Sequence, residues 1–143
     1  MELYAKQSTK VLVVGQTPNT NALMLSKIIK FKIPVTNITA LTRLDANRAI
    51  AQFAAAKKVS PSEVNQLVVW GNGLSETVFA DTSMVTVGQQ PRANPSHDEQ
   101  FIKQIQQREK SVMDQLKSGV KAMSMAKAAA DHMRDWWCGK CST

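Results

Sequence analysis

A carboxylate and a guanidinium lie three residues apart near the middle of this chain, in the string LTRLDANRA at residues 41–49. Asp45 is predicted to cap the following helix, because a cap carboxylate accepts hydrogen bonds from first-turn amides. Arg48 then falls at the third helical position, where the positive end of the helix dipole disfavours a cation. A charge placed against local preference is typical of a functional site, and a planar guanidinium suits pairing with a carboxylate ligand.

This string resembles the signature of cytosolic-type malate dehydrogenases, within the lactate/malate dehydrogenase superfamily. The resemblance implies that Asp45 stands where the family's aspartate orients the catalytic histidine. It also implies that Arg48 stands where the family's arginine binds the substrate carboxylate. The alternative is an ordinary capped helix, but the nine-residue run and the matches below favour the family interpretation.

The string WGNG at residues 70–73 decides the prediction about catalysis. It resembles the family string WGNH, whose histidine exchanges a proton with the substrate hydroxyl as hydride moves to the cofactor. Gly73 stands in the histidine's place, and proton transfer of this kind contributes roughly 10²–10⁴ in rate. His97 and His132 are not expected to replace it. His97 lies in a predicted loop, and His132 lies in DHMRD, which resembles a structural family string.

Two further site positions differ from the family strings. VGQTPNTNAL resembles VGNPANTNAL and has Gln16 where the family's asparagine faces the substrate and the nicotinamide. Before AMS, where the family tends to have a small hydroxyl residue near the nicotinamide, this chain has Val120 and Lys121. Such changes would displace groups that a reaction needs to within about half an ångström. The sequence therefore predicts no intact catalytic set.

No residue is predicted to bind a cofactor or a metal. The glycine-rich GxxGxxG turn that places a pyrophosphate at a helix N-terminus does not occur in the sequence. By resemblance, that turn and the mobile loop with the other substrate arginines would precede Met1. Cys138 and Cys141 form a single CxxC, which is half a zinc site at most, and a tail without a ligand is the favoured interpretation.

The elements that must position these residues form a helix-rich α/β chain. Short continuous apolar runs predict buried strands, the first of them in a parallel sheet, and alternation of β-branched and polar residues predicts another strand. The predicted strands are residues 11–15, 35–41, 67–71 and a short edge strand at 83–87. The first predicted helix follows the turn at residues 16–21, and the second spans 46–57. A capping box at Ser60 is predicted to begin a short helix, and a second capping box at Ser96 a long one. Helical character is predicted to continue through 126–135 and to end at the tryptophan tail.

Apolar faces are predicted on three helices, and the face of the 46–57 helix comprises its alanines with Ile50, Phe53 and Ala54. The first helix is expected to be capped by Asn19 or Thr20 and to present a core face. The residues of that face are Leu23, Leu25, Ile28 and Ile29. The face of the long helix comprises Phe101, Ile105, Val112, Leu116 and Val120.

The resemblance implies a partial lactate/malate dehydrogenase-like fold. Residues 1–71 would be a remnant of the second half of the dinucleotide-binding domain together with the signature helix. Residues 72–143 would form part of the catalytic domain, mostly helical.

Composition and charge limit the function classes. The chain has 143 residues, 43% of them apolar, which is enough for a core. Its formal charge of +7 favours an anionic surface such as nucleic acid, acidic lipid or an acidic protein, with plain solubility as the alternative. No apolar run approaches the ~20 residues of a bilayer span. The N-terminus lacks the apolar segment of a signal peptide. An intracellular location is expected, cytoplasmic by resemblance or mitochondrial in an organellar assembly.

The sequence therefore predicts a non-catalytic malate dehydrogenase-like protein that acts as a structural or interaction subunit of a larger protein assembly. Part of a dehydrogenase should leave sheet edges and apolar faces for a partner to cover. The expected docking surfaces are the 46–57 helix, which in the family lies at the dimer interface, and the Trp136–Trp137 tail. One alternative is a piece of a split or truncated NAD-dependent malate dehydrogenase. A second is a basic RNA-associated assembly subunit.

Overall fold

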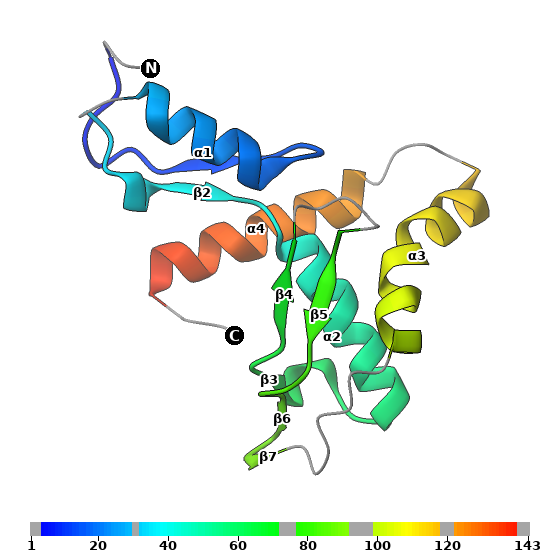
Figure 1. The fold of residues 1–143 in the computed structure, drawn as a ribbon. Helices are drawn as coiled ribbons and strands as arrows, with labels where there is room; N and C mark the ends of the chain where they lie inside the picture. The colour runs from blue at the N-terminus through cyan, green and yellow to red at the C-terminus, as the bar shows by residue number, and fades with distance from the viewer. Residues whose placement is uncertain (1–3, 30–31, 72–76, 92–98, 118–121, 140–143) are drawn as a thin grey trace.

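The chain begins with a β–α–β unit that lies at one end of the molecule (Figure 1). The computed structural model describes residues 4–29, 32–71, 77–91, 99–117 and 122–139. Strand β1 (Val11–Val13) lies parallel to β2 (Ile38–Ala40), with Val11 opposite Ile38. Helix α1 (Pro18–Ile28) and the 3-10 turn Val35–Asn37 connect them. The parallel pairing predicted from the apolar run is confirmed, although both strands are shorter than predicted.

Both faces of β1 are covered. Val11 and Val13 pack with Ile29 on the side of α1. Leu12 points the other way and packs against the cluster that contains Leu44 and Ala128. An apolar run without alternation therefore forms this strand because side chains on both faces meet a helical layer.

The start of α1 differs from the prediction. Pro18 occupies the first helical position, and Thr17 precedes it without a side-chain capping bond. Proline suits this position because the amide hydrogen it lacks would have no partner inside the helix. Asn19 therefore does not cap the helix, and its side-chain amide instead donates to the backbone oxygen of Gly71.

The predicted core face of α1 is half wrong. Leu25 and Ile29 pack against the strands, whereas Leu23 and Ile28 are exposed. The reason is that β1 and β2 form a sheet of two strands, which α1 covers with only one of its sides.

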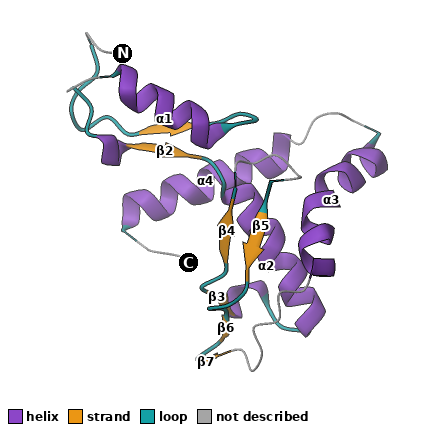
Figure 2. Ribbon diagram, viewed as in Figure 1, coloured by secondary structure: helices purple, strands orange, loops and turns teal. Residues whose placement is uncertain are grey.

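Helices form most of the regular structure beyond this unit, and each strand has only two or three residues (Figure 2). The remaining elements in chain order are α2 (Arg43–Lys57), the 3-10 turn Pro61–Glu63, β3 (Val64–Asn65), β4 (Val68–Trp70), β5 (Phe79–Asp81), β6 (Thr86–Val87), β7 (Gln90–Pro91), α3 (Glu99–Leu116) and α4 (Ala122–Cys138). No helix among the described ranges combines the length and apolar content needed to cross a membrane.

Helix α2 begins three residues before the predicted start, and Asp45 is not its cap. The backbone oxygen of Thr42 already accepts from the amides of Asp45 and Ala46, at 3.1 and 3.4 Å. The cation in the first turn is therefore Arg43, and its charge is offset by Asp135 of α4 at 2.9 Å. The interpretation of Arg48 as a cation at the third helical position was wrong, because Arg48 lies about one turn further along.

The short turn after α2 follows its prediction. The backbone amide of Ser60 donates to the Glu63 carboxylate at 2.8 Å, and the Ser60 hydroxyl accepts from the amide of Ser62. The predicted capping box is confirmed, although it starts a 3-10 turn of three residues instead of a longer helix.

The strands after α2 are antiparallel and form two small sheets. Strand β4 pairs with β5, and β6 lies between β3 and β7. The prediction of an edge strand at residues 83–87 was therefore wrong. Strand β4 is also covered on one face only, because Val69 packs toward the core while Val68 and Trp70 are exposed.

The two C-terminal helices differ from their predictions near their ends. Leu116 of α3 is exposed, although Ile105 is buried as predicted. The capping box from Ser96 and position 120 fall outside the described residues. Helix α4 continues through both tryptophans to Cys138, so the predicted end before the tail was wrong.

The main core lies between α2, the antiparallel strands and α3. Its centre is Phe53, which is 3% exposed and makes an edge-to-face contact with Phe101 of α3 at 6.2 Å between ring centroids. The buried residues of this cluster are Ala49, Phe53, Ala54, Val64, Leu67, Val78, Ala80, Val85 and Ile105. The prediction that the 46–57 helix has an apolar face is confirmed, and that face is core within this chain. The division into units of residues 1–71 and 72–143 stays a prediction.

Candidate functional site

Asp45 and Arg48 meet on one side of α2, where they form an ion pair with a separation of 3.3 Å between Arg48 Nη1 and Asp45 Oδ1. The same nitrogen lies 3.3 Å from Oε2 of Glu109, a residue of α3. The Arg48 side chain is only 13% exposed. Two carboxylates of the same chain therefore engage one partly buried guanidinium, and together they leave this cluster with a formal charge of −1.

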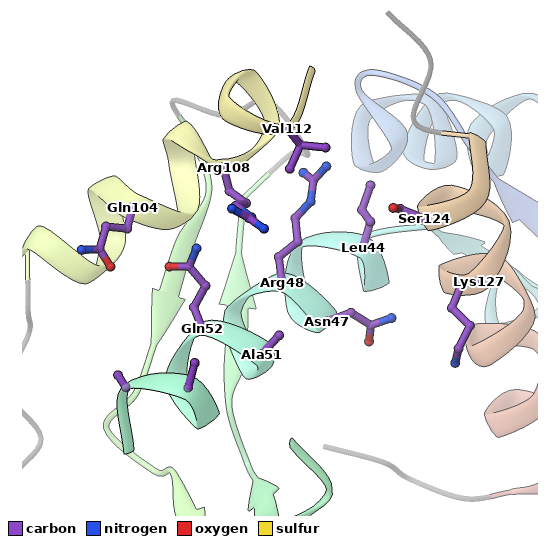
Figure 3. Close-up of a pocket in the computed structure, with 12 residues that line it drawn as sticks. Leu44, Asn47, Arg48, Ala51, Gln52, Gln104, Arg108, Val112, Ser124 and Lys127 are labelled. Atoms are coloured by element: carbon purple, nitrogen blue, oxygen red, sulfur yellow. The ribbon is translucent and has the colours of Figure 1, made fainter. Parts of the chain in front are cut away.

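A groove of about 680 Å³ opens beside this cluster, between α2, α3 and α4 (Figure 3). Its floor is formed by small side chains of α2, including Ala51. Basic groups enter it from all three helices, namely Arg48, Arg108 and Lys127. The full lining is Leu44, Asn47, Arg48, Ala51, Gln52, Ala55, Ala56, Gln104, Arg108, Val112, Ser124 and Lys127.

The lining of the groove determines what chemistry it can support. Its charged lining side chains are basic and its other polar groups are amides and a hydroxyl. Two of the three basic side chains, Arg48 and Lys127, are paired with carboxylates of this chain, so an anion in the groove would compete with those carboxylates. Among the described lining residues there is no histidine, cysteine or carboxylate that could act as a general base. The arrangement has the space to hold a small ligand between the three helices.

Of the positions predicted as lost from the site, only Gln16 belongs to the described residues. The bond from Asn19 to Gly71 joins the first turn of α1 to the residue that follows β4. Gln16 itself is exposed. Gly73, His97, Val120 and Lys121 lie outside the described residues.

Gly71 has a structural role at this junction. Its φ is +119°, a conformation that residues with a side chain rarely adopt. A Cβ at this position would lie 2.2 Å from the backbone oxygen of Thr77, which leaves no space for a side chain. The backbone after β4 therefore depends on glycine for both space and conformation.

His132 has a structural place away from the groove. Its Nε2 lies 3.0 Å from the Thr39 hydroxyl of β2, and its ring contacts Trp136 edge to face. Burial lowers the pKa of His132, and the nearby Arg43 cation lowers it further, against the opposing effect of Asp135. The ring lines a separate cavity of about 240 Å³. The contact between α4 and β2 is consistent with the structural interpretation of the DHMRD string.

Two nearly buried carboxylates on α4 fasten this helix to the start of α2. Asp135 pairs with Arg43, and Asp131 accepts from the Asn47 amide at 3.4 Å and from Lys127 at 2.6 Å. The Lys127 hydrogen bond is the main cause that lowers the pKa of Asp131, against the opposing effect of burial. Neither this network nor Glu109 was predicted from the sequence. The spacing of two aspartates at i and i+4 on one helix was the available indication for the network.

The sequence predicts no residue that binds a metal or a cofactor, and this stays a prediction. They contain no group of three or more histidine, cysteine or acidic side chains placed to hold a metal, and Cys138 is exposed and free. The turn between β1 and α1 leads into Pro18, which has no amide hydrogen to offer a phosphate. Cys141 lies outside the described residues.

The tryptophan tail is partly packed on its own chain. Lys10 places its ammonium group 4.2 Å from the centroid of the Trp136 ring, whereas Trp137 is exposed. One tryptophan therefore belongs to the fold, and the other remains available as a contact surface.

Comparisons with known proteins agree on one family. The family profile described as lactate/malate dehydrogenase, alpha/beta C-terminal domain, matches residues 42–142. Malate dehydrogenase 3, cytoplasmic, of Arabidopsis thaliana is 42% identical over 97% of this chain and 43% of its own length. The cytoplasmic malate dehydrogenase of Taenia solium is 43% identical over 97% of this chain and 44% of its own length.

Solved structures give the same result. The malate dehydrogenase of Naegleria fowleri matches with a TM-score of 0.82 and 35% identity over 94% of this chain and 42% of that protein. A Trichomonas vaginalis lactate dehydrogenase in complex with NADH and oxamate matches with a TM-score of 0.79, 32% identity and the same coverage. The chain thus spans less than half the length of these relatives.

Proposed function

The chain belongs to the lactate/malate dehydrogenase family, and from that premise we propose that it is a non-catalytic member that acts as an interaction subunit of a larger protein assembly. Two parts of this proposal are separable. The first is the loss of dehydrogenase chemistry, and the second is the gain of a binding role. Each has its own support and its own experiment.

The pairing of Arg48 carries the first part of the proposal. In this chain the guanidinium that would hold a substrate carboxylate is engaged by Asp45 and Glu109, at 3.3 Å from each. A ligand carboxylate that pairs end-on with Nη1 and Nη2 of the arginine competes with Asp45 and Glu109, because both of them contact Nη1. The sequence adds independent support, because Gly73 stands where the family's proton-transferring histidine is expected.

A chimeric enzyme tests the loss of chemistry. This chain would replace the corresponding 42% of the Naegleria fowleri malate dehydrogenase, which supplies the rest of the protein. The unmodified chimera should produce no NADH from malate and NAD above background. Gly73→His should raise the rate by about 10²–10⁴, because it restores a proton acceptor. Gly73→Ala is the matched control and should stay inactive.

The chimera can contradict the proposal directly. Turnover by the unmodified chimera at the rate of the Gly73→His variant would mean that the missing histidine does not limit catalysis. Thermal unfolding of all three chimeras, followed by circular dichroism, would verify that they fold equally well.

The binding role is tested on the protein from its own source. Native mass spectrometry at the endogenous level should find the chain in one defined complex with other proteins. The physical reason is that α1, β4 and the end of α4 carry apolar side chains that are exposed to water. A partner protein would cover this apolar surface. Recovery as a free, folded monomer would contradict this part of the proposal.

One alternative is favoured by a specific observation. The chain aligns along 97% of its own length with only 43% or 44% of the Arabidopsis and Taenia relatives, as one piece of a split dehydrogenase would. A complex whose second polypeptide carries a GxxGxxG turn, and which oxidises malate without any substitution, would establish this alternative and overturn the non-catalytic one.

A further inference from the structure

Helix α1 is apolar on two sides, and only one side has a partner within the described residues. Leu25 and Ile29 pack toward β1 and β2. On the other side Leu23, Met24 and Ile28 are 59%, 58% and 65% exposed. Figure 1 shows α1 at the edge of the molecule, with no described element beyond its outer side.

The exposed residues form one continuous stripe, which we call the α1 outer stripe: Leu23, Met24, Lys27 and Ile28. At 3.6 residues per turn these four positions fall within an arc of roughly 140°. Lys27 lies inside the arc and is itself exposed. The stripe therefore combines an apolar surface with a positive charge.

The charge around the stripe is of one sign. Residues 3–41 contain five lysines and no aspartate, glutamate or arginine, whereas the rest of the chain has 13 basic and 11 acidic residues. This part of the chain therefore carries most of the net charge of +7. A large charge asymmetry between parts of a chain is typical of an anionic partner.

A concave site adjoins the stripe. A cavity of about 620 Å³ lies at the C-terminal end of α1 and is lined by Lys27 and Lys32 together with apolar and neutral polar residues. The other lining residues are Gln7, Ser26, Ile29, Ile33, Pro34 and Val35. Because Lys27 belongs to both features, the stripe and the cavity form one continuous surface.

We propose that this surface docks a segment of a second protein that carries both carboxylates and apolar side chains. The apolar side chains would cover Leu23, Met24 and Ile28, and a carboxylate would approach Lys27 at the mouth of the cavity. This inference rests on the proposed function and names the face and the chemistry of the partner. It differs from the docking surfaces expected on the 46–57 helix and the tryptophan tail.

Other occupants fit this surface less well. A second copy of the chain would bring two basic surfaces together, which opposes association. A lipid surface is planar and would leave the concave cavity unfilled. A nucleic acid would meet an exposed apolar stripe, and the described residues of the β–α–β unit offer Tyr4 as their single aromatic for stacking on bases.

Photo-crosslinking in the source organism gives the first test. The photoreactive residue p-benzoylphenylalanine would replace Met24 in the full chain, and Met123 of α4, which is 89% exposed, gives a matched control position. Met24 should crosslink to one protein, through a segment of net negative charge with apolar residues. Met123 should not crosslink to that segment.

Charge reversal tests the role of the lysines. Lys27→Glu/Lys32→Glu should reduce the Met24 crosslink at least about fivefold, because two attractive charges become repulsive. Lys103→Glu/Lys110→Glu changes the net charge equally at two exposed positions of α3 and should leave the crosslink unchanged.

Direct binding tests the apolar contacts. The probe is a synthetic peptide of the crosslinked segment, and the measurement is fluorescence anisotropy with the purified chain. Met24→Asp/Ile28→Asp should raise Kd at least about tenfold, because burial of two apolar side chains is lost. Both residues are exposed, and thermal unfolding would verify that the variant folds.

The outcomes separate this inference from the proposed function. A partner crosslinked from Met123 but not from Met24 overturns the inference and leaves the interaction role standing, whereas no partner from either position or in the native complex overturns both. A crosslink to a second copy or to a neutral or basic segment overturns the inference. The chain can also be tested against phosphatidylserine vesicles and polyuridylate. If it binds either of them, if Lys27→Glu/Lys32→Glu abolishes that binding, and if Met24 gives no protein crosslink, the inference is overturned as well.

Discussion

Removal of the Glu109 carboxylate should make Arg48 available to an external ligand. In the native chain a small carboxylate such as oxamate competes with Glu109, whose Oε2 lies 3.3 Å from Arg48 Nη1. The Glu109 side chain is 25% exposed and the contact is long, so the pair lies toward the weak end of charged contacts. We therefore assign the competition about 1 kcal/mol, which corresponds to roughly fivefold in Kd.

The assay is isothermal titration calorimetry of oxamate into the purified chain. Glu109→Ala should lower Kd by that factor, and Glu109→Ala/Arg48→Ala should lose the gain. Glu99→Ala is the matched control, because it removes an exposed carboxylate from the first turn of the same helix and changes the net charge equally. An equal Kd for the native chain and Glu109→Ala would refute the reasoning that Glu109 occupies the arginine.

Three further predictions concern stability. Phe53→Ala should lower the free energy of unfolding in urea by about 3–5 kcal/mol, since this ring is 3% exposed in the main core. Gly71→Ala should lower the melting temperature more than Gly88→Ala, because both glycines have positive φ but only the Cβ at Gly71 would meet backbone atoms; equal losses would contradict the steric argument. The pKa of His132 is lowered on folding, so the unfolded chain binds its proton more readily and stability should fall as the pH drops below about 6.5. His132→Gln should flatten the melting temperature between pH 7 and pH 5, and an unchanged pH profile would show that this ring does not contribute.

Local patterns were sufficient for much of the fold. The apolar run at residues 11–15 predicted a strand in a parallel sheet, and the pairing of β1 with β2 confirms it. The capping box at Ser60 forms as predicted, because both of its hydrogen bonds lie within four residues. The contact between Asp45 and Arg48 also follows from their spacing, since residues three apart share one side of a helix.

Contacts between distant segments were beyond these patterns. Helix α2 begins before Asp45 because the oxygen of Thr42 accepts the first helical bonds and Asp135 neutralises Arg43 from another helix. Hydrophobic periodicity likewise predicted one core face on α1, without showing that a sheet of two strands covers only Leu25 and Ile29 and leaves Leu23 and Ile28 exposed.

The sequence by itself determined the family, the glycine at position 73 and the concentration of lysines in residues 3–41, because these are properties of residue identity and order. Only the tertiary structure decided that Glu109 reaches Arg48 and that the outer stripe of α1 stays exposed. The physical reason is the same in both cases. Which charges meet and which apolar faces are covered depends on how helices pack against elements distant in sequence, and spacing along one element carries no information about that packing.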